Sequence, residues 1–170
     1  MLETIINEFT GTFSAVPVWV SATRLVAAML LGAVIGFERE LRHKPAGLRT
    51  NMLVAIAACL FVIVGIELAE LEFGNSDSKR ADPLRLIEAV TAGVAFLAAG
   101  LIFTSGGKVR NITTGASLWL AGAIGLACGA GQIPLAAMVA LIVVLVLMIL
   151  RQMEKLLGTH DSRAQTDDTG

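Results

Sequence analysis

Residues 37–51, FERELRHKPAGLRTN, separate two apolar segments that are each long enough to cross a lipid bilayer. Four cations fall within this short stretch, namely Arg39, Arg42, Lys44 and Arg49. Because Lys and Arg collect in the cytoplasmic loops of membrane proteins, we expect these residues to form a cytoplasmic turn between two membrane helices. Such a concentration of charge in an apolar chain also predicts that the turn belongs to the functional face of the protein.

The composition supports a membrane protein. Of the 170 residues, 55% are hydrophobic and 16% are charged, whereas an ordinary soluble domain has about 25% charged residues. The apolar residues are grouped in blocks, which is typical of membrane helices. The chain has no tyrosine and few aromatic residues, so recognition of nucleic acid through stacked bases is not expected. Cys59 and Cys128 lie in apolar stretches, and we interpret both as small buried side chains.

The apolar blocks predict an all-α, polytopic membrane protein with one membrane domain over residues 21–150. Its five spans are expected at about residues 21–37, 46–66, 84–103, 113–130 and 133–150. Residues 1–20 place apolar side chains at helical spacing, which predicts an amphipathic helix lying in the membrane interface. Residues 151–170 are predicted to form a polar tail.

The distribution of cations predicts the orientation in the bilayer. Five spans place the 37–51 turn, the 104–112 turn and the C-terminal tail on the same side. That side holds nine cations, and the other side holds Arg24, Lys79, Arg80 and Arg85. We therefore expect the N-terminus outside and the C-terminus in the cytoplasm of a bacterium, with the protein in its inner membrane.

Glycines at helical spacing predict close packing of the spans. Gly32 and Gly36 form a GxxxG pair in the first span, and Gly125 and Gly129 form another in the fourth. The fourth span is the richest in glycine, so we expect it inside the bundle. The first pair either packs within the chain or forms the seam of a homodimer, and the sequence leaves both alternatives open. A packing role is likewise expected for the third-span glycines, Gly93 and Gly100.

The cytoplasmic turns are predicted to assemble one polar face. Its candidate residues for binding or partner contact are Glu38, Arg39, Arg49, Thr50, Asn51, Arg110, Thr113 and Thr114. Thr113 and Thr114 are suited to cap the start of the fourth span. Free N–H groups at helix starts, together with Arg49 and Arg110, favour anions. The face is expected to bind a carboxylate-bearing partner segment, an anionic lipid headgroup or a phosphate compound. The alternative is that its charges only set the orientation and tie the turns together.

A second group of charges lies within the predicted spans. Glu88 is about 7 Å from the outer end of the third span at the rise of an α-helix. Arg85 precedes it by three residues, and Arg24 of the first span is a second possible partner. We expect a structural ion pair near the outer interface, and the functional alternative is a contact for a proton or a cation. A single glutamate beside arginines does not supply the oxygen ligands that magnesium requires, so no metal site is expected.

Three stretches resemble the MgtC/SapB family of bacterial inner-membrane proteins: RLVAAMLLGAVIGFERELRHKPAGLRT (residues 24–50), GVAFLAAG (93–100) and VRNITTGASLW (109–119). The resemblance covers about residues 20–150, which is nearly the whole membrane portion. It implies a five-span bundle in the cytoplasmic membrane. It also implies a link to magnesium limitation, to survival inside macrophages in pathogenic members, and to restraint of the F-type ATP synthase.

The chain departs from the family pattern in two places. Many members carry a folded cytoplasmic domain after the last span, where about twenty polar residues follow here, so only the membrane domain is expected. Ala95 and Ala98 stand where the family usually has more glycine. We expect a non-enzymatic protein without a cofactor that modulates a membrane partner under magnesium limitation or acid stress. The alternative is a small ion or solute transporter with a path near Glu88.

Overall fold

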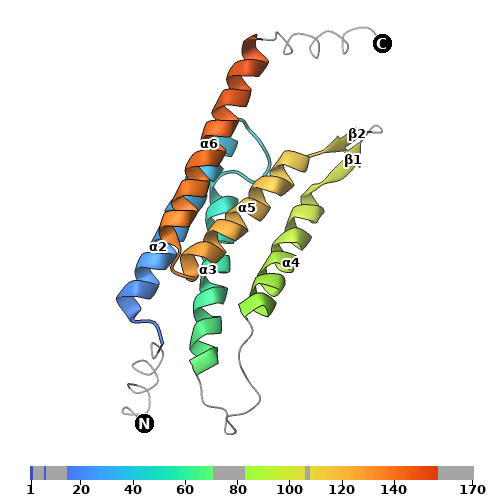
Figure 1. Ribbon diagram of the computed structural model, residues 1–170. Helices are drawn as coiled ribbons and strands as arrows, with labels where there is room; N and C mark the ends of the chain where they lie inside the picture. Colours follow the sequence, from blue (N-terminus) through green and yellow to red (C-terminus); the bar gives the residue numbers. More distant parts are fainter. Residues whose placement is uncertain (2–5, 7–14, 71–82, 106–107, 157–170) are drawn as a thin grey trace.

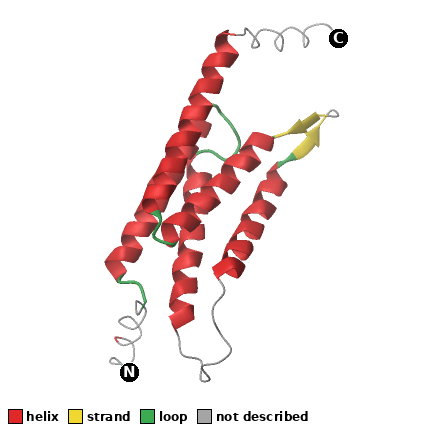
Figure 2. Cartoon of the chain, in the orientation of Figure 1, coloured by secondary structure: helices red, strands yellow, loops and turns green. Residues whose placement is uncertain are grey.

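The computed structural model describes residues 1, 6, 15–70, 83–105 and 108–156. Within these ranges, the chain forms a bundle of five long helices and one short β-hairpin (Figures 1 and 2). Each of the five helices is long and apolar enough to cross a membrane. This finding confirms the predicted all-α, five-span class. The amphipathic helix expected within residues 1–20 lies outside the described residues, apart from isolated positions and residues 15–20, of which Val18 to Val20 begin the first long helix. The polar tail was predicted over residues 151–170, but residues 151–156 continue the last helix, and the rest of the predicted tail lies outside the described residues.

The helices are α2 (Val18–Leu41), α3 (Leu48–Glu70), α4 (Pro83–Leu101), α5 (Ile112–Gly129) and α6 (Ile133–Leu156). Strands β1 (Phe103–Ser105) and β2 (Lys108–Arg110) form an antiparallel pair between α4 and α5, in which Phe103 lies opposite Arg110. The sequence predicted a plain turn here and a third span ending at residue 103. The helix ends at Leu101 instead, and the backbone of the connection is paired across the hairpin.

The α2 helix continues through the charged residues that the sequence assigned to a turn. Glu38, Arg39 and Glu40 belong to its last turn, and the connection to α3 is confined to residues 42–47. An ion pair between Glu38 and Arg42, four residues apart, links side chains on one face of this helical end. The charged residues therefore project from a helix, which fixes the directions in which they point.

Helix α5 lies at the centre of the bundle. It packs against α2, α3, α4 and α6. Half of its membrane-spanning apolar stretch is buried inside the bundle, as expected for the glycine-rich span. One buried apolar cluster joins α2, α3, α5 and α6 around Ile35, Cys59 and Ile124. A second joins α3, α4 and α5 around Val94 and Leu118. Helix α6 lies along the outside of the bundle, and only 11% of its apolar stretch Ile133–Leu150 is buried.

The glycines of both GxxxG pairs lie against neighbouring helices of the same chain. A Cβ atom on Gly32 would come 2.9 Å from the carbonyl oxygen of Asn51, and one on Gly129 would come 2.7 Å from that of Cys59. Gly36 faces the start of α3, and Gly125 faces the backbone of Ala55. Of the two alternatives for the first pair, the structure therefore shows packing within the chain.

The other two predicted packing glycines differ. A Cβ atom on Gly93 or Gly100 would meet nothing within 4 Å. Helix α4 packs on α5 through Val90, Val94 and Ala98 and makes little contact with α3. Because Gly93 and Gly100 lie away from that packed face, they make none of the close helix contacts that the sequence predicted for them within this chain.

Candidate functional site at the hairpin end of the bundle

One end of the bundle gathers most of the predicted site residues. We call it the hairpin end, and it consists of the last turn of α2, the 42–47 turn, the first turn of α3, the β-hairpin and the first turn of α5. Figure 1 shows the 42–47 turn and the hairpin on the same side, opposite the α5–α6 turn. The sequence separates these segments by about sixty residues, and the fold brings them together.

Arg39 is a charged residue that is buried at this end. Its side chain is 4% exposed, and its Nη2 donates hydrogen bonds to the hydroxyl oxygens of Thr114, at 3.0 Å, and Thr113, at 3.3 Å. The Nε atom has no hydrogen-bond partner among the described residues. Removing a guanidinium group from water costs free energy, and neutral hydroxyl partners offset less of this cost than a carboxylate would. Arg39 therefore joins α2 to α5 and leaves donor capacity unused.

Thr113 and Thr114 do not cap α5 as predicted. The residue before the helix is Asn111, whose backbone is left-handed with φ 64° and whose side chain makes no capping bond. Its Nδ2 instead donates to the carbonyl oxygen of Leu101, at 3.1 Å. The two threonines lie inside the first turn, where Thr114 is buried and Thr113 is exposed. Their hydroxyls are consequently available to Arg39.

Asn51 and Glu40 fix the turn between α2 and α3. Asn51 is fully buried, and its Nδ2 donates to the carbonyl oxygens of Ala46, at 2.8 Å, and Gly47, at 2.9 Å. Glu40 accepts a 3.0 Å hydrogen bond from the backbone N–H of Leu48, the first residue of α3. A Cβ atom at position 47 would overlap the Glu40 carboxylate, so a larger residue there would displace this side chain from Leu48. Sequence reasoning missed Glu40 and Gly47 as positioning residues, although an acid shortly before a helix start is a recognisable signal.

Glu38 and Arg42 connect α2 to α6. Arg42 forms an ion pair with Glu38 and also donates a 3.2 Å hydrogen bond to the carbonyl oxygen of Leu147. The sequence placed Glu38 on the binding face, and the structure engages one of its oxygens in this pair. Its Oε2 is buried and has no hydrogen-bond partner among the described residues.

Backbone strain is concentrated at this end. Among the described residues, the non-glycine positions with positive φ are His43 (51°), Ala46 (57°) and Asn111 (64°). His43 and Ala46 lie in the 42–47 turn, and Asn111 immediately precedes α5. For alanine this conformation costs about 1–2 kcal/mol. Strain of this kind persists where surrounding contacts fix it, and it is frequent at functional sites.

The remaining predicted site residues form the outer surface of the hairpin end. Arg49, Thr50, Arg110 and Thr113 are exposed, and no ion pair to Arg49 or Arg110 occurs among the described residues. The structure therefore divides the predicted set into two groups. Arg39, Asn51 and Thr114 are buried and hold the helices together, whereas the exposed group presents two guanidinium groups beside two helix starts.

The ion pair predicted within the spans is not formed among the described residues. Arg24 donates a 2.8 Å hydrogen bond to the carbonyl oxygen of Gly129, at the end of α5, and does not reach Glu88. Its charge satisfies a carbonyl that the helix leaves free, at the negative end of the helix dipole. Arg85 and Glu88 are both exposed on α4, and no ion pair joins them among the described residues.

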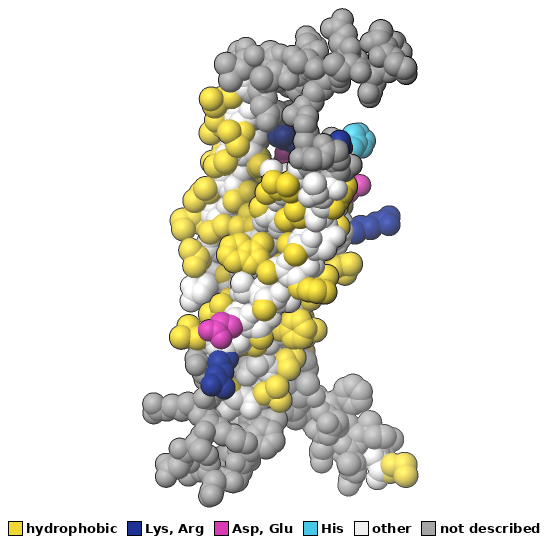
Figure 3. All heavy atoms as spheres, turned by 90° about the vertical axis from the view of Figure 1, so that its right-hand side faces the viewer, with side chains coloured by type: hydrophobic (Ala, Val, Ile, Leu, Met, Phe, Trp, Pro, Cys, Tyr) yellow, Lys and Arg dark blue, Asp and Glu magenta, His cyan; other side chains and the backbone are white. Residues whose placement is uncertain are grey.

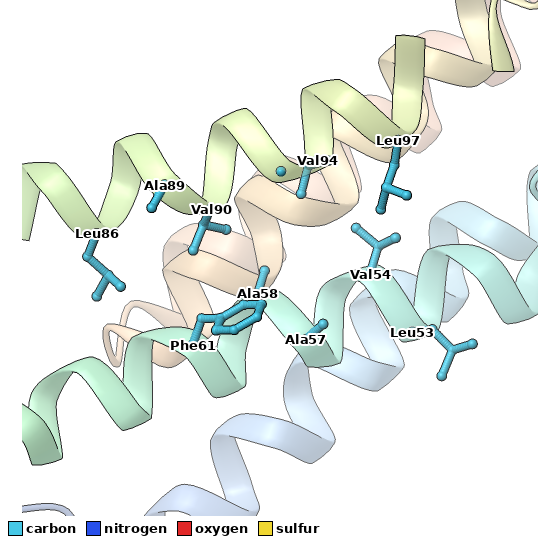
Figure 4. Close-up of a pocket in the computed structure, with 11 residues that line it drawn as sticks. Leu53, Val54, Ala57, Ala58, Phe61, Leu86, Ala89, Val90, Val94 and Leu97 are labelled. Carbon is cyan, nitrogen blue, oxygen red and sulfur yellow. The ribbon is translucent and has the colours of Figure 1, made fainter. Parts of the chain in front are cut away.

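A groove of about 570 Å³ separates α3 from α4. Figure 4 shows Phe61 and Val54 of α3 and Val90 and Val94 of α4 lining it, with α5 behind. Its lining is apolar and does not include Glu88.

In the described part of the chain, no three His, Cys, Asp or Glu side chains gather in a way that could hold a metal ion. Cys59 and Cys128 are buried and free. They belong to the apolar cluster around α5, in agreement with their interpretation as small buried side chains.

Comparisons with known proteins show which proteins this chain is similar to. The sequence profile described as "MgtC family" matches residues 25–156. The chain is 41% identical over 137 residues to "Protein MgtC" of Brucella abortus (strain 2308), covering 81% of this chain and 54% of that protein. It is 40% identical over 128 residues to "Protein MgtC" of Salmonella typhimurium (strain LT2), covering 75% and 51%. An uncharacterized protein of Haemophilus influenzae is 39% identical over 125 residues, covering 73% and 52%.

The chain spans about half the length of the curated relatives it matches. No solved structure matches it. The matched region includes all five helices except the first turns of α2, and it contains every residue of the hairpin end. On the extent of the profile match and on the identity to these relatives, the chain belongs to the MgtC family.

Proposed function

We propose that this protein is a non-enzymatic regulatory protein of the bacterial cytoplasmic membrane that binds a membrane partner through the hairpin end. In this proposal, the hairpin end faces the cytoplasm, as the distribution of cations indicates. The partner is the F-type ATP synthase, and regulation operates under magnesium limitation or acid stress, as the family resemblance implies.

The observation that carries the proposal is the division of the site residues. Arg39 and Asn51 are buried and hold three helices and a turn in place. Arg49 and Arg110 remain exposed beside the starts of α3 and α5. Helix starts carry partial positive charge, and guanidinium groups bind carboxylates in a two-pronged geometry. A rigid base that presents cations suits an acidic segment of a partner protein.

A photo-crosslinking experiment tests the binding surface. A photoreactive amino acid replaces Val109, which is 55% exposed on the hairpin, and the matched control replaces Gln132, exposed in the α5–α6 turn. We expect a cross-linked membrane protein from position 109 and none from position 132 in native membranes. Adding Arg49→Glu and Arg110→Glu should reduce the yield by at least about tenfold, since reversed charges repel an acidic partner.

A second measurement tests the regulation. ATP-driven proton pumping is followed in inverted membrane vesicles that contain equal amounts of the native protein or of the Arg49→Glu, Arg110→Glu protein. We expect the native protein to lower the pumping rate and the charge-reversed protein to leave it unchanged. Equal pumping with both proteins, or a cross-linked partner that is not a subunit of the synthase, would refute the assignment of this partner.

A further inference from the structure

The outward face of α4 presents charge where a lipid-facing helix should be apolar. Val90, Val94 and Ala98 pack toward α5, and the opposite side is exposed. Its residues recur at the three- and four-residue spacing of one helical face. They are Arg85, Glu88, Ala92, Phe96 and Ala99, and all five are exposed. Figure 3 shows acidic and basic side chains low on this mostly apolar side of the molecule.

These two charges lie inside the span. Glu88 follows the start of α4 at Pro83 by five residues, which corresponds to about 7 Å along the helix. An ionised side chain that faces hydrocarbon without a partner is costly, and such residues normally pair or face protein. Arg85 does not pair with Glu88 in the described part of the chain, and Arg24 is engaged by Gly129. The described chain thus leaves both an acid and a base open to a partner.

We propose that this face binds the same face of a second copy of the chain, so that Arg85 of each copy pairs with Glu88 of the other. A surface with one acid and one base on adjacent turns is complementary to itself, which is the condition for a two-fold symmetric interface. Both copies insert with the same orientation, so the two α4 helices run parallel about an axis normal to the membrane. The four charges then lie at nearly the same depth and form two reciprocal ion pairs.

The shape of the face fits the same occupant. Phe96 is 79% exposed, and Ala92 and Ala99 flank it one turn away on either side. The small alanine side chains let two helices approach closely. In the proposed dimer, the space beside Ala92 and Ala99 accommodates the phenyl ring of Phe96 from the other copy. Lipid chains supply no countercharge, and an unrelated helix would have to bring a matching acid and base. The Gly32–Gly36 pair, the seam considered from the sequence, is already filled by α3.

Disulfide cross-linking in native membranes tests the interface directly. The variant Ala92→Cys is compared with Leu141→Cys, which lies on α6 with 61% of its surface exposed. Unmodified protein serves as the background, since Cys59 and Cys128 are buried. We expect a disulfide-linked dimer from Ala92→Cys at a yield at least about tenfold above the control, because only this face meets its own copy. Equal yields, or an adduct with a different protein, would overturn the proposal.

Charge reversal then tests the reciprocal pairing. In the Ala92→Cys background, Arg85→Glu gives each copy two acids on this face, and Glu88→Arg gives each copy two bases. Each single variant should lose about tenfold in cross-linking when expressed alone, because like charges meet across the axis. Two differently tagged copies, one with each substitution, should cross-link to each other as well as the parent. The ion pairing would be refuted if neither substitution changed the cross-linking yield. It would also be refuted if the mixed pair of variants remained monomeric in membranes. Neither measurement depends on the partner proposed for the hairpin end.

Discussion

The Nη2 atom of Arg39 lies 3.0 Å from the hydroxyl oxygen of Thr114, and this contact joins the last turn of α2 to the first turn of α5. Both side chains are buried. Ser117 extends the connection, since its hydroxyl donates to the carbonyl oxygen of Thr114 at 2.8 Å. Without a hydroxyl at position 114, a buried guanidinium would lose its closest acceptor.

We therefore expect Thr114→Val to destabilise the protein by about 1–3 kcal/mol, the range for stranding a buried donor. Thr114→Ser keeps the hydroxyl and should cost less. Thr113→Val is the matched control, because Thr113 is exposed and its bond to Arg39 is longer, at 3.3 Å. Thermal unfolding in detergent, followed by circular dichroism, measures the three variants. An equal shift in Tm for Thr113→Val and Thr114→Val would contradict the role given to the buried hydroxyl.

The glycines of α4 and α5 make a contrasting pair. At Gly125, a Cβ atom would come 2.8 Å from the carbonyl carbon of Ala55 and 2.9 Å from its Cα, both on the backbone of α3. At Gly93, it would meet nothing within 4 Å. We expect Gly125→Ala to lower stability by about 1–3 kcal/mol through overpacking, with Gly93→Ala unchanged or slightly more stable because alanine favours helix. The same unfolding assay compares the two, and a reversed order would show that α5 is not the packed centre.

Arg24 offers a third test. Its Nη1 donates a 2.8 Å hydrogen bond to the carbonyl oxygen of Gly129. Hydrogen bonds that involve a charged group contribute about 1.5–3 kcal/mol, so Arg24→Gln should lower the free energy of unfolding by an amount in that range. Arg49→Gln is the control, because Arg49 is exposed and makes no ion pair among the described residues. If Arg24→Gln and Arg49→Gln unfold at the same temperature, the cap on α5 contributes nothing.

Hydrophobicity and glycine spacing sufficed to predict the number of helices and the central place of α5, because both follow from local composition. The contacts of single charges could not be predicted in this way. Arg24 was expected near Glu88, yet it bonds the end of α5. That choice depends on how helices far apart in sequence cross, and spacing along one helix does not encode it. Glu88 was therefore assigned a partner that the fold does not supply.

At the hairpin end, too, the residue types could be predicted from the sequence, whereas their burial and contacts depend on the fold. The site residues were predicted, including Arg39, Asn51 and Thr114. Their division into buried and exposed sets was not, because it depends on the extension of α2 to Leu41 and on the short 42–47 turn that follows it. The β-hairpin between α4 and α5 also escaped prediction, since strands of three residues carry too little alternation to be recognised.

The two ends of the bundle should lie on opposite sides of the membrane. The fold places Lys44 in the 42–47 turn and Val109 on the hairpin at one end, and Gln132 at the other. Single cysteines at these exposed positions are treated with a membrane-impermeant maleimide, on intact spheroplasts and on inverted vesicles. If the hairpin end faces the cytoplasm, Lys44→Cys and Val109→Cys react only in inverted vesicles, and Gln132→Cys reacts only in spheroplasts. The buried Cys59 and Cys128 should stay unlabelled in both preparations. Positions 44 and 109 are separated by α3 and α4, and a chain that crosses the bilayer twice returns to the side from which it started. Labelling of these two positions from opposite sides would therefore show that α3 and α4 do not both cross the bilayer.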